Sequence, residues 1–173
     1  RKDVVLEDHT QKRVYTIDTE YATIYEDALA IETKDDQTIL YYYFPLLADY
    51  IGMKHPMNKY LEMMSSTIYA RGYVKPLLPF DFMKQNLSFD AGQTKRAFTV
   101  EVTLDQEKQI QQVKCYRSKI NVSQNYSFES FRDMEITPEF QTMIDLSKEL
   151  SSQVKKLRIK SMKNVIEVYA LFC

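Results

Sequence analysis

Four carboxylates lie within ten residues of one another in the stretch TIDTEYATIYEDALAIE, which runs from Thr16 to Glu32. Apolar runs flank them on both sides, and they are Asp18, Glu20, Glu26 and Asp27. Carboxylate oxygens are the ligands that Mg²⁺ prefers, and bound ions of this kind can assist hydrolysis. The cluster therefore raises the hypothesis of a metal-dependent hydrolytic site. The alternative is that these carboxylates are solvated side chains of a loop and bind no metal ion.

Composition excludes several other chemistries. The chain has 173 residues, which predicts one domain, and its net charge of −1 gives no global field that would attract nucleic acid. Three glycines and no Gly-rich motif exclude a phosphate-binding glycine loop. Two cysteines and two histidines are too few for a zinc site. The low cysteine count favours a reducing, intracellular compartment, either cytoplasmic or mitochondrial.

Two further expectations come from the hydropathy of the chain and from its first residue. No apolar run approaches the roughly 20 residues that a membrane-spanning helix needs, so we expect no membrane partner. The chain begins at Arg1 without a methionine, and we expect that an upstream segment was removed or lies outside this sequence.

Short strands are expected to position the acidic cluster. Runs rich in β-branched and aromatic residues predict strands at 12–17, 27–33 and 38–44. The sequence KDDQ at 34–37 predicts a hairpin turn between the last two. We expect the aromatic residues 41–44 to pack in the core, because tyrosine and phenylalanine are buried more often than they are exposed.

A second hairpin and two helices complete the predicted elements. Alternation predicts a strand at 96–105 that pairs with 109–120. A helix is expected after Pro56, with an apolar face of Met57, Tyr60, Leu61 and Met64. A longer helix is expected after the N-cap Thr137, with a stripe of Phe140, Met143, Ile144, Leu150, Val154, Leu157 and Met162. The sequence thus predicts an α+β fold with a mixed or antiparallel sheet and packed helices.

Two apolar segments have less regular patterns. Residues 69–92 contain two glycines and two prolines, and we expect an ordered loop that crosses the sheet. Residues 165–172 predict a strand near the C-terminus, which we expect to need a covering partner because the sheet would otherwise be open at its edge.

Six segments, in order, resemble the catalytic RNB domain of the ribonuclease II family of processive 3′→5′ exoribonucleases. TIDTEYATIYEDALAIE is similar to the family's acidic signature, which opens with Ile-Asp and closes with Asp-x-Asp-Asp-Ala-Leu. The other segments are YYYFPLLADYI, SSTIYARGYVKPLLP, LSFDAGQTKRAFTVEV, YRSKI followed by SFESF, and KKLRIKSMKNVIEV. The resemblance runs from about Val14 to Val168. It implies that residues 1–173 form the N-terminal half of an RNB-like domain.

In that family four aspartates hold divalent metal beside the scissile phosphate. The resemblance assigns Asp18, Glu26 and Asp27 to this catalytic site, with Asp18 and Asp27 as the metal ligands and Mg²⁺ as the cofactor of an active enzyme. The remaining position of the motif is Ile24, and Glu26 is one methylene longer than aspartate. Because isoleucine cannot coordinate a cation, we expect weak or absent metal binding and impaired hydrolysis. A less favoured alternative is that the carboxylate of Glu20 takes the place of the missing metal ligand.

The resemblance also implies RNA-binding residues, which are Tyr69, Arg96 and Arg117. Tyr69 matches the tyrosine that stacks on the terminal base in the family, although a packed loop tyrosine is an equal alternative. Histidine and acidic positions of the family are occupied here by Tyr43, Leu46 and Asp49, and basic positions by Asn121, Gln124 and Asn125. Fewer cations mean fewer phosphate contacts and a weaker affinity for RNA.

Three hypotheses follow. The first is a degenerate ribonuclease II-like domain with a structural or RNA-binding role in a larger RNA-processing or ribonucleoprotein assembly, with single-stranded RNA as a possible ligand. The second is half of a split, Mg²⁺-dependent exoribonuclease, completed by a protein subunit that carries the second half of the domain. The third is a protein-interaction module without nucleic-acid contact, which the near-zero net charge favours.

Overall fold

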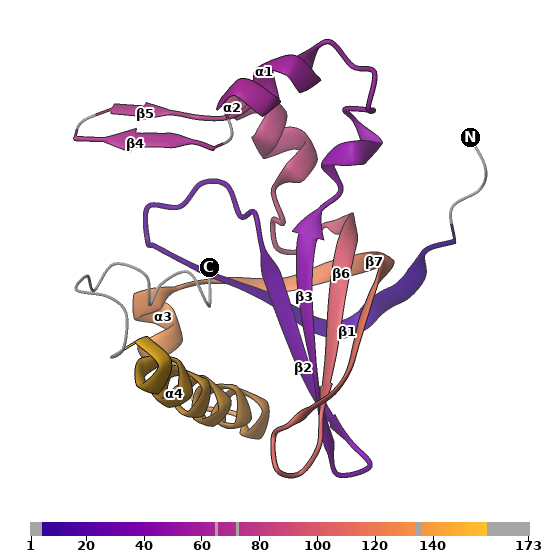
Figure 1. The fold of residues 1–173 in the computed structure, drawn as a ribbon, viewed down its shortest axis with the longest axis vertical. Helices are drawn as coiled ribbons and strands as arrows, with labels where there is room; N and C mark the ends of the chain where they lie inside the picture. The colour runs from indigo at the N-terminus through magenta and orange to yellow at the C-terminus, as the bar shows by residue number, and fades with distance from the viewer. Residues whose placement is uncertain (1–4, 65, 72, 134–135, 159–173) are drawn as a thin grey trace.

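The computed structural model describes residues 5–64, 66–71, 73–133 and 136–158 (Figure 1). Five strands form a closed barrel in the order β1-β2-β3-β6-β7. Their bounds are Glu7–Asp18 for β1, Ala28–Lys34 for β2, Gln37–Pro45 for β3, Thr94–Leu104 for β6 and Ile110–Ser127 for β7. Four of the five pairings are antiparallel, and β1 and β7 are parallel. The predicted mixed sheet is therefore confirmed.

The prediction of an open sheet is wrong, and the length of β7 is the reason. This strand has 18 residues, where the sequence pattern predicted 12. Its first part pairs with β6, and its last part, from Ser118 to Ser127, pairs with β1. Because β1 also pairs with β2, the two edges of the sheet meet. The predicted strand at 165–172 lies outside the described residues.

The barrel interior combines large and small side chains from adjacent strands. Ala28 lies opposite Tyr43, and Ala30 lies opposite Tyr41, on the paired strands β2 and β3. All four are buried, and Tyr43 is fully enclosed together with Val14, Ile120 and Val122. An alanine leaves the volume that the neighbouring tyrosine ring fills, which is how small barrels accommodate side chains of unequal size. Tyr41 and Tyr43 thus meet the expectation of core packing, whereas Phe44 is 42% exposed.

The turn between β2 and β3 follows the sequence prediction. Asp35 and Asp36 occupy it, with φ angles of 49° and 61°. Positive φ at both central residues suits the twist of a two-residue hairpin, and aspartate tolerates this conformation better than most residues. The register then aligns Lys34 with Gln37 and continues without a break to Ala28 and Tyr43.

Helix α4, Pro138–Arg158, packs on the outside of the barrel (Figure 1). Its Leu146 is buried in a cluster with Ile31, Leu40 and Leu104. The predicted N-cap is confirmed, because the backbone N–H of Phe140 donates to the Oγ1 of Thr137 at 3.4 Å. Helix α3, Phe128–Asp133, connects β7 to this region and contributes Phe131 to an aromatic cluster with Phe140. Leu146 was not in the predicted stripe, and Met162 lies outside the described residues.

Above the barrel lies a smaller layer formed by residues 47–87 (Figure 1). It contains η1 (Leu47–Asp49), α1 (Met57–Met64), a hairpin of β4 (Ile68–Ala70) and β5 (Tyr73–Lys75), α2 (Phe80–Phe82) and the π turn η2 (Met83–Leu87). The predicted loop across 69–92 is therefore wrong, because these residues form short regular elements. On α1, Met57 and Leu61 face the local core as predicted, whereas Tyr60 is 40% exposed.

A hydrogen-bonded network of polar side chains lies inside one end of the barrel. His9 is 5% exposed, and its Nδ1 lies 3.0 Å from the hydroxyl oxygen of Tyr43. Its Nε2 lies 3.3 Å from the hydroxyl oxygen of Tyr116, which donates to Glu101. Burial lowers the pKa of His9, and the charge of Lys12 lowers it further. The network satisfies polar groups that would otherwise be costly to bury.

Among the described residues, no helix has the length and the apolar character needed to cross a membrane.

Candidate functional site

The loop between β1 and β2 brings Asp18 and Asp27 together. Asp18 is the last residue of β1, and Asp27 immediately precedes β2. Pairing of Tyr15 with Leu29 holds the two strands side by side, so the loop between them must return close to its start. Burial raises the pKa of Asp18 to about 6, and the nearby charge of Asp27 contributes to this rise. Burial also raises the pKa of Asp27, and the nearby charge of Glu26 raises it further. The structure thus places the two aspartates near each other, and their role as a shared site stays a prediction.

The remaining carboxylates of the stretch do not complete a set of metal ligands. Glu20 and Glu26 are exposed. Within the residues that the structure describes, no group of three or more histidine, cysteine, aspartate or glutamate side chains could hold a metal ion. Magnesium requires near-octahedral oxygen coordination, and a two-ion site requires more anionic ligands than one pair supplies. The described side chains therefore do not fit the two-ion magnesium centre that the family resemblance implies.

Ile24 lies in apolar surroundings. It packs against a buried cluster of Ile51, Leu78, Met83 and Leu87, which come from the layer above the barrel. The loop is fixed there by its backbone, because the N–H of Phe89 donates to the carbonyl of Tyr25 at 2.9 Å. The N–H of Tyr25 donates to the hydroxyl of the fully buried Ser88 at 3.2 Å. A side chain at position 24 thus contributes to the local core.

Arg96 and Arg117 lie on the outer face of the barrel, where one carboxylate pairs with both. The Nη1 of Arg96 is 3.2 Å from the Oδ2 of Asp49, and the Nη1 of Arg117 is 3.8 Å from the Oδ1 of the same residue. Neither arginine is among the charges that shift the pKa of Asp18 or Asp27. The structure therefore brings the two predicted RNA-binding arginines together. It does not show them acting on the acidic pair.

The third predicted RNA-binding residue, Tyr69, lies in β4, and its backbone pairs with Val74 of β5. The position of the Tyr69 side chain is outside what the structure describes. The β4–β5 hairpin projects away from the barrel (Figure 1). Tyr73 and Val74 on β5 are 58% and 55% exposed.

Asp49 was expected only as a departure from the family pattern, and its pairing with both arginines was not expected. The buried His9 network was not expected either. Neither had a local signal, because the partners of Asp49 and of His9 are far away in the chain.

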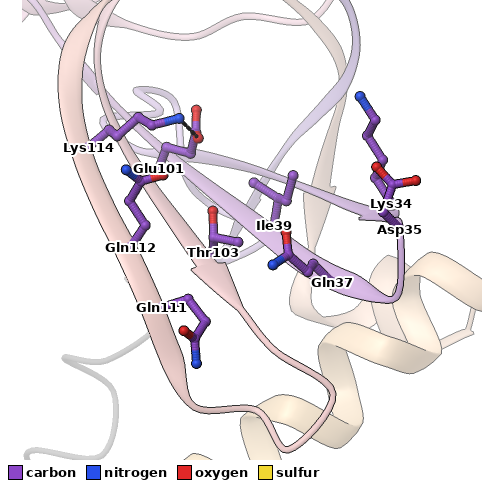
Figure 2. Close-up of a pocket in the computed structure, with 9 residues that line it drawn as sticks. All are labelled: Lys34, Asp35, Gln37, Ile39, Glu101, Thr103, Gln111, Gln112 and Lys114. Carbon is purple, nitrogen blue, oxygen red and sulfur yellow. Dashed lines mark hydrogen bonds and ion pairs between the residues drawn. The ribbon is translucent and has the colours of Figure 1, made fainter.

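A polar recess of about 430 Å³ lies between the β2–β3 hairpin and the β6–β7 hairpin, at one end of the barrel (Figure 2). Lys114 and Glu101 form an ion pair of 3.1 Å at one side of it. The recess is lined by Lys34, Asp35, Gln37, Ile39, Glu101, Thr103, Gln111, Gln112 and Lys114. No predicted site residue contributes to this lining. The recess is therefore separate from the acidic loop and from the arginines.

Comparison with known proteins defines the family. The model of the RNB domain matches residues 6–168, and the chain therefore belongs to the RNB-domain family. Ribonuclease R of Mycoplasmopsis pulmonis is 22% identical over 149 residues, which cover 83% of this chain and 21% of that protein. The chain thus spans about a fifth of the length of the curated relatives that it matches.

Solved structures show the same fold. The structure of Mycoplasma genitalium RNase R in complex with ribose-methylated single-stranded RNA matches with a TM-score of 0.74 and 21% identity, over 88% of this chain and 25% of that one. The structure of yeast Ssd1, described as a pseudonuclease, matches with a TM-score of 0.71 and 18% identity, over 83% of this chain and 18% of that one. The mixed sheet and helices of this chain are thus those of an RNB domain. Because the fold occurs in a ribonuclease and in a pseudonuclease, it does not decide between activity and its loss.

Proposed function

We propose that this chain is a degenerate RNB domain with a structural or RNA-binding role in a larger RNA-processing or ribonucleoprotein assembly. The single observation that carries the proposal is the packing of Ile24 against the apolar cluster of Ile51 and its neighbours. A position that must supply a negative oxygen in an active centre instead supplies a partly buried apolar side chain. The isoleucine then serves the packing of the loop, and Asp18 and Asp27 are the vestiges of a metal site.

The RNA-binding part of the proposal rests on Arg96, Arg117 and Tyr69. Arginine binds phosphate through a planar, permanently charged group, and tyrosine can stack on a base. The related RNase R of Mycoplasma genitalium has been solved in complex with single-stranded and with double-stranded RNA. We propose single-stranded RNA for this chain, because separated bases can stack on exposed aromatic side chains.

A second candidate function is half of a split, Mg²⁺-dependent 3′→5′ exoribonuclease. The retained pair of Asp18 and Asp27 supports it, because two closely spaced carboxylates could bind metal if a partner chain supplied the other ligands. This candidate requires a protein subunit that carries the remaining half of the domain. For either function we propose a reducing compartment, cytoplasmic or mitochondrial, in keeping with the exposed and unpaired Cys115.

The experiment that separates the two candidates is a nuclease assay on 5′-labelled single-stranded RNA with Mg²⁺ or Mn²⁺. It uses the 173-residue chain alone and together with any protein that co-purifies with it. We expect no shortening of the RNA in either preparation. Degradation from the 3′ end that Asp27→Asn abolishes would refute the degenerate domain and establish the split enzyme. Degradation that Asp27→Asn leaves unchanged would identify a contaminating nuclease.

A further inference from the structure

The outer face of β3, β6 and β7 presents two phenylalanines beside the two arginines. Phe44 on β3 lies opposite Phe98 on β6, and Phe98 lies opposite Arg117 on β7. Phe44 and Phe98 are 42% and 38% exposed, although neighbouring residues on the same strands are fully enclosed in the barrel. Arg96 is two residues before Phe98 and therefore lies on the same face of β6. We call these four residues, Phe44, Arg96, Phe98 and Arg117, the aromatic–arginine face.

Aromatic rings and cations on one sheet face have the chemistry that binds single-stranded nucleic acid. Bases stack on exposed rings without regard to sequence, and guanidinium groups neutralise the phosphates between them. The exposure of two large apolar rings next to each other otherwise has an energetic cost in water. No residue of the described chain covers this pair enough to bury it.

Asp49 occupies the place where a phosphate would bind. Its side chain is 18% exposed, whereas those of Arg96 and Arg117 are 47% and 36% exposed. One carboxylate, fixed at the end of η1, thus faces two guanidinium groups that are open to solvent on their other sides. A phosphodiester and a carboxylate both carry a single negative charge and both accept hydrogen bonds from arginine. An RNA phosphate must therefore compete with Asp49 for the same cations.

Two other charged residues near the two arginines are Lys119 and Asp8, and they largely offset each other. Lys119 lies opposite Arg96 on β7 and adds to the positive charge of this region. Asp8 of β1 lies opposite Lys119. Hydrogen bonds from the side chain and backbone of Thr10 lower the pKa of Asp8, and the charge of Lys119 adds a smaller contribution in the same direction. Asp8 thus offsets Lys119, and Asp49 offsets the two arginines.

We propose that the aromatic–arginine face binds single-stranded RNA and that Asp49 acts as an internal phosphate mimic that limits this binding. Displacement of Asp49 by a phosphate makes both arginines available, while Phe44 and Phe98 stack on the flanking bases. The inference rests on the RNA-binding role proposed above and adds to it the binding surface and the residue that sets its affinity.

The test measures the affinity for a labelled oligouridylate of about ten nucleotides, a length within the range that one small barrel binds. The variants are Asp49→Asn, Asp49→Asn combined with Arg96→Gln and Arg117→Gln, and Phe98→Ala. Glu107→Gln is the matched control, because it also removes one negative charge but lies in the turn between β6 and β7. Affinities are measured between about 50 and 200 mM salt, because the slope of log affinity against log salt concentration reports the number of phosphate contacts.

We expect Asp49→Asn to tighten binding about fivefold, because two surface ion pairs no longer compete with the RNA. The salt dependence should steepen by about 0.7 for each arginine that gains a phosphate. Glu107→Gln should leave the affinity within about twofold, since it changes only the overall charge. The triple variant should lose the gain, and Phe98→Ala should weaken binding without changing the salt slope.

Binding by the wild type with no gain in Asp49→Asn would overturn the inference and leave the RNA-binding role intact. Binding by Asp49→Asn alone would support the inference and show that the natural chain is held in a state of low affinity. Absence of binding in both proteins at low salt would overturn both the RNA-binding role and the inference. A gain that survives in the triple variant would also overturn it, because another surface would then bind the RNA.

Discussion

The carboxylate of Asp49 lies 3.2 Å from the guanidinium of Arg96, so the chain supplies its own anion to a cation that the family resemblance assigns to RNA. Arg117 faces the same carboxylate from the next strand. The negative charge of Asp49 therefore lowers the positive potential that the two arginines give to this face.

This ion pair should contribute little to folding. The two arginine side chains are more than a third exposed, and exposed pairs typically contribute less than about 1 kcal/mol. We predict that Asp49→Asn lowers the free energy of unfolding by less than about 1 kcal/mol, measured by urea denaturation, with Glu107→Gln as the control. A loss of several kcal/mol would show that Asp49 is a structural residue whose main role is to hold η1 on the barrel.

Restoring a carboxylate at position 24 should damage the fold. Ile24 packs, partly buried, against Ile51, Leu78, Met83 and Leu87, and an ionised side chain in its place would lose part of its hydration. We predict that Ile24→Asp lowers the free energy of unfolding by about 1–3 kcal/mol. The matched control Ile24→Val keeps the apolar character and should cost no more than about 1 kcal/mol. If Ile24→Asp is as stable as the wild type, position 24 is not part of the core, and the main support for the degenerate domain is lost.

The raised pKa of Asp18 predicts a specific dependence of stability on pH. The folded protein has a pKa of about 6 for this group, against an ordinary value of 3.8. Between these values the folded state binds more protons than the unfolded state, so the contribution of Asp18 to stability is present below pH 3.8 and is lost as the pH rises through about 6. Asp18→Asn should therefore be more stable than the wild type at pH 7, and this advantage should disappear near pH 4.

Melting temperatures of the wild type and Asp18→Asn across this pH range provide the measurement. The lowered pKa of His9 gives the opposite slope, because the folded state then binds fewer protons, but it acts equally in both proteins and cancels in their difference. Glu20→Gln, which removes an exposed carboxylate from the same loop, should leave the pH profile unchanged. An unchanging difference between wild type and Asp18→Asn would contradict the burial of Asp18.

The hydroxyl of Tyr43 should matter more for stability than its position in an apolar core suggests. It lies 3.0 Å from the Nδ1 of His9, and both residues are buried. Tyr43→Phe leaves a buried nitrogen without its partner, which costs about 1–3 kcal/mol. Tyr42→Phe, on the opposite face of the same strand, removes a hydroxyl from the outer cluster and should cost less. Equal losses in the two variants, measured by chemical denaturation, would argue against the network.

Local patterns predicted much of the fold. Alternation in 96–105 predicted β6, the pair Asp35–Asp36 produced the expected hairpin, and Thr137 capped the long helix. The closure of the barrel was not predictable in this way, because it depends on the parallel pairing of β1 with β7 from distant parts of the chain. The β4–β5 hairpin had a local signal in the glycine that lies between its two segments in the sequence, but these residues were expected to form a loop.

For the candidate site, the sequence made a prediction only where a motif carried it. The motif supplied Asp18, Ile24 and Asp27, and the structure added that Ile24 belongs to an apolar cluster. It could not supply the contact of Asp49 with Arg96 and Arg117, because salt bridges between separate elements leave no periodic trace in the sequence.

The central claim, that the loop with Ile24 no longer forms a metal centre, is tested most directly by titration with Mn²⁺, a spectroscopic substitute for Mg²⁺. The titration is made at about pH 8, where an aspartate with a pKa near 6 is ionised. Wild type and Asp27→Asn are compared by electron paramagnetic resonance, with any co-purifying protein present. The degenerate domain predicts no saturable site that the substitution removes. A stoichiometric Mn²⁺ site in the wild type that is lost in Asp27→Asn would contradict it.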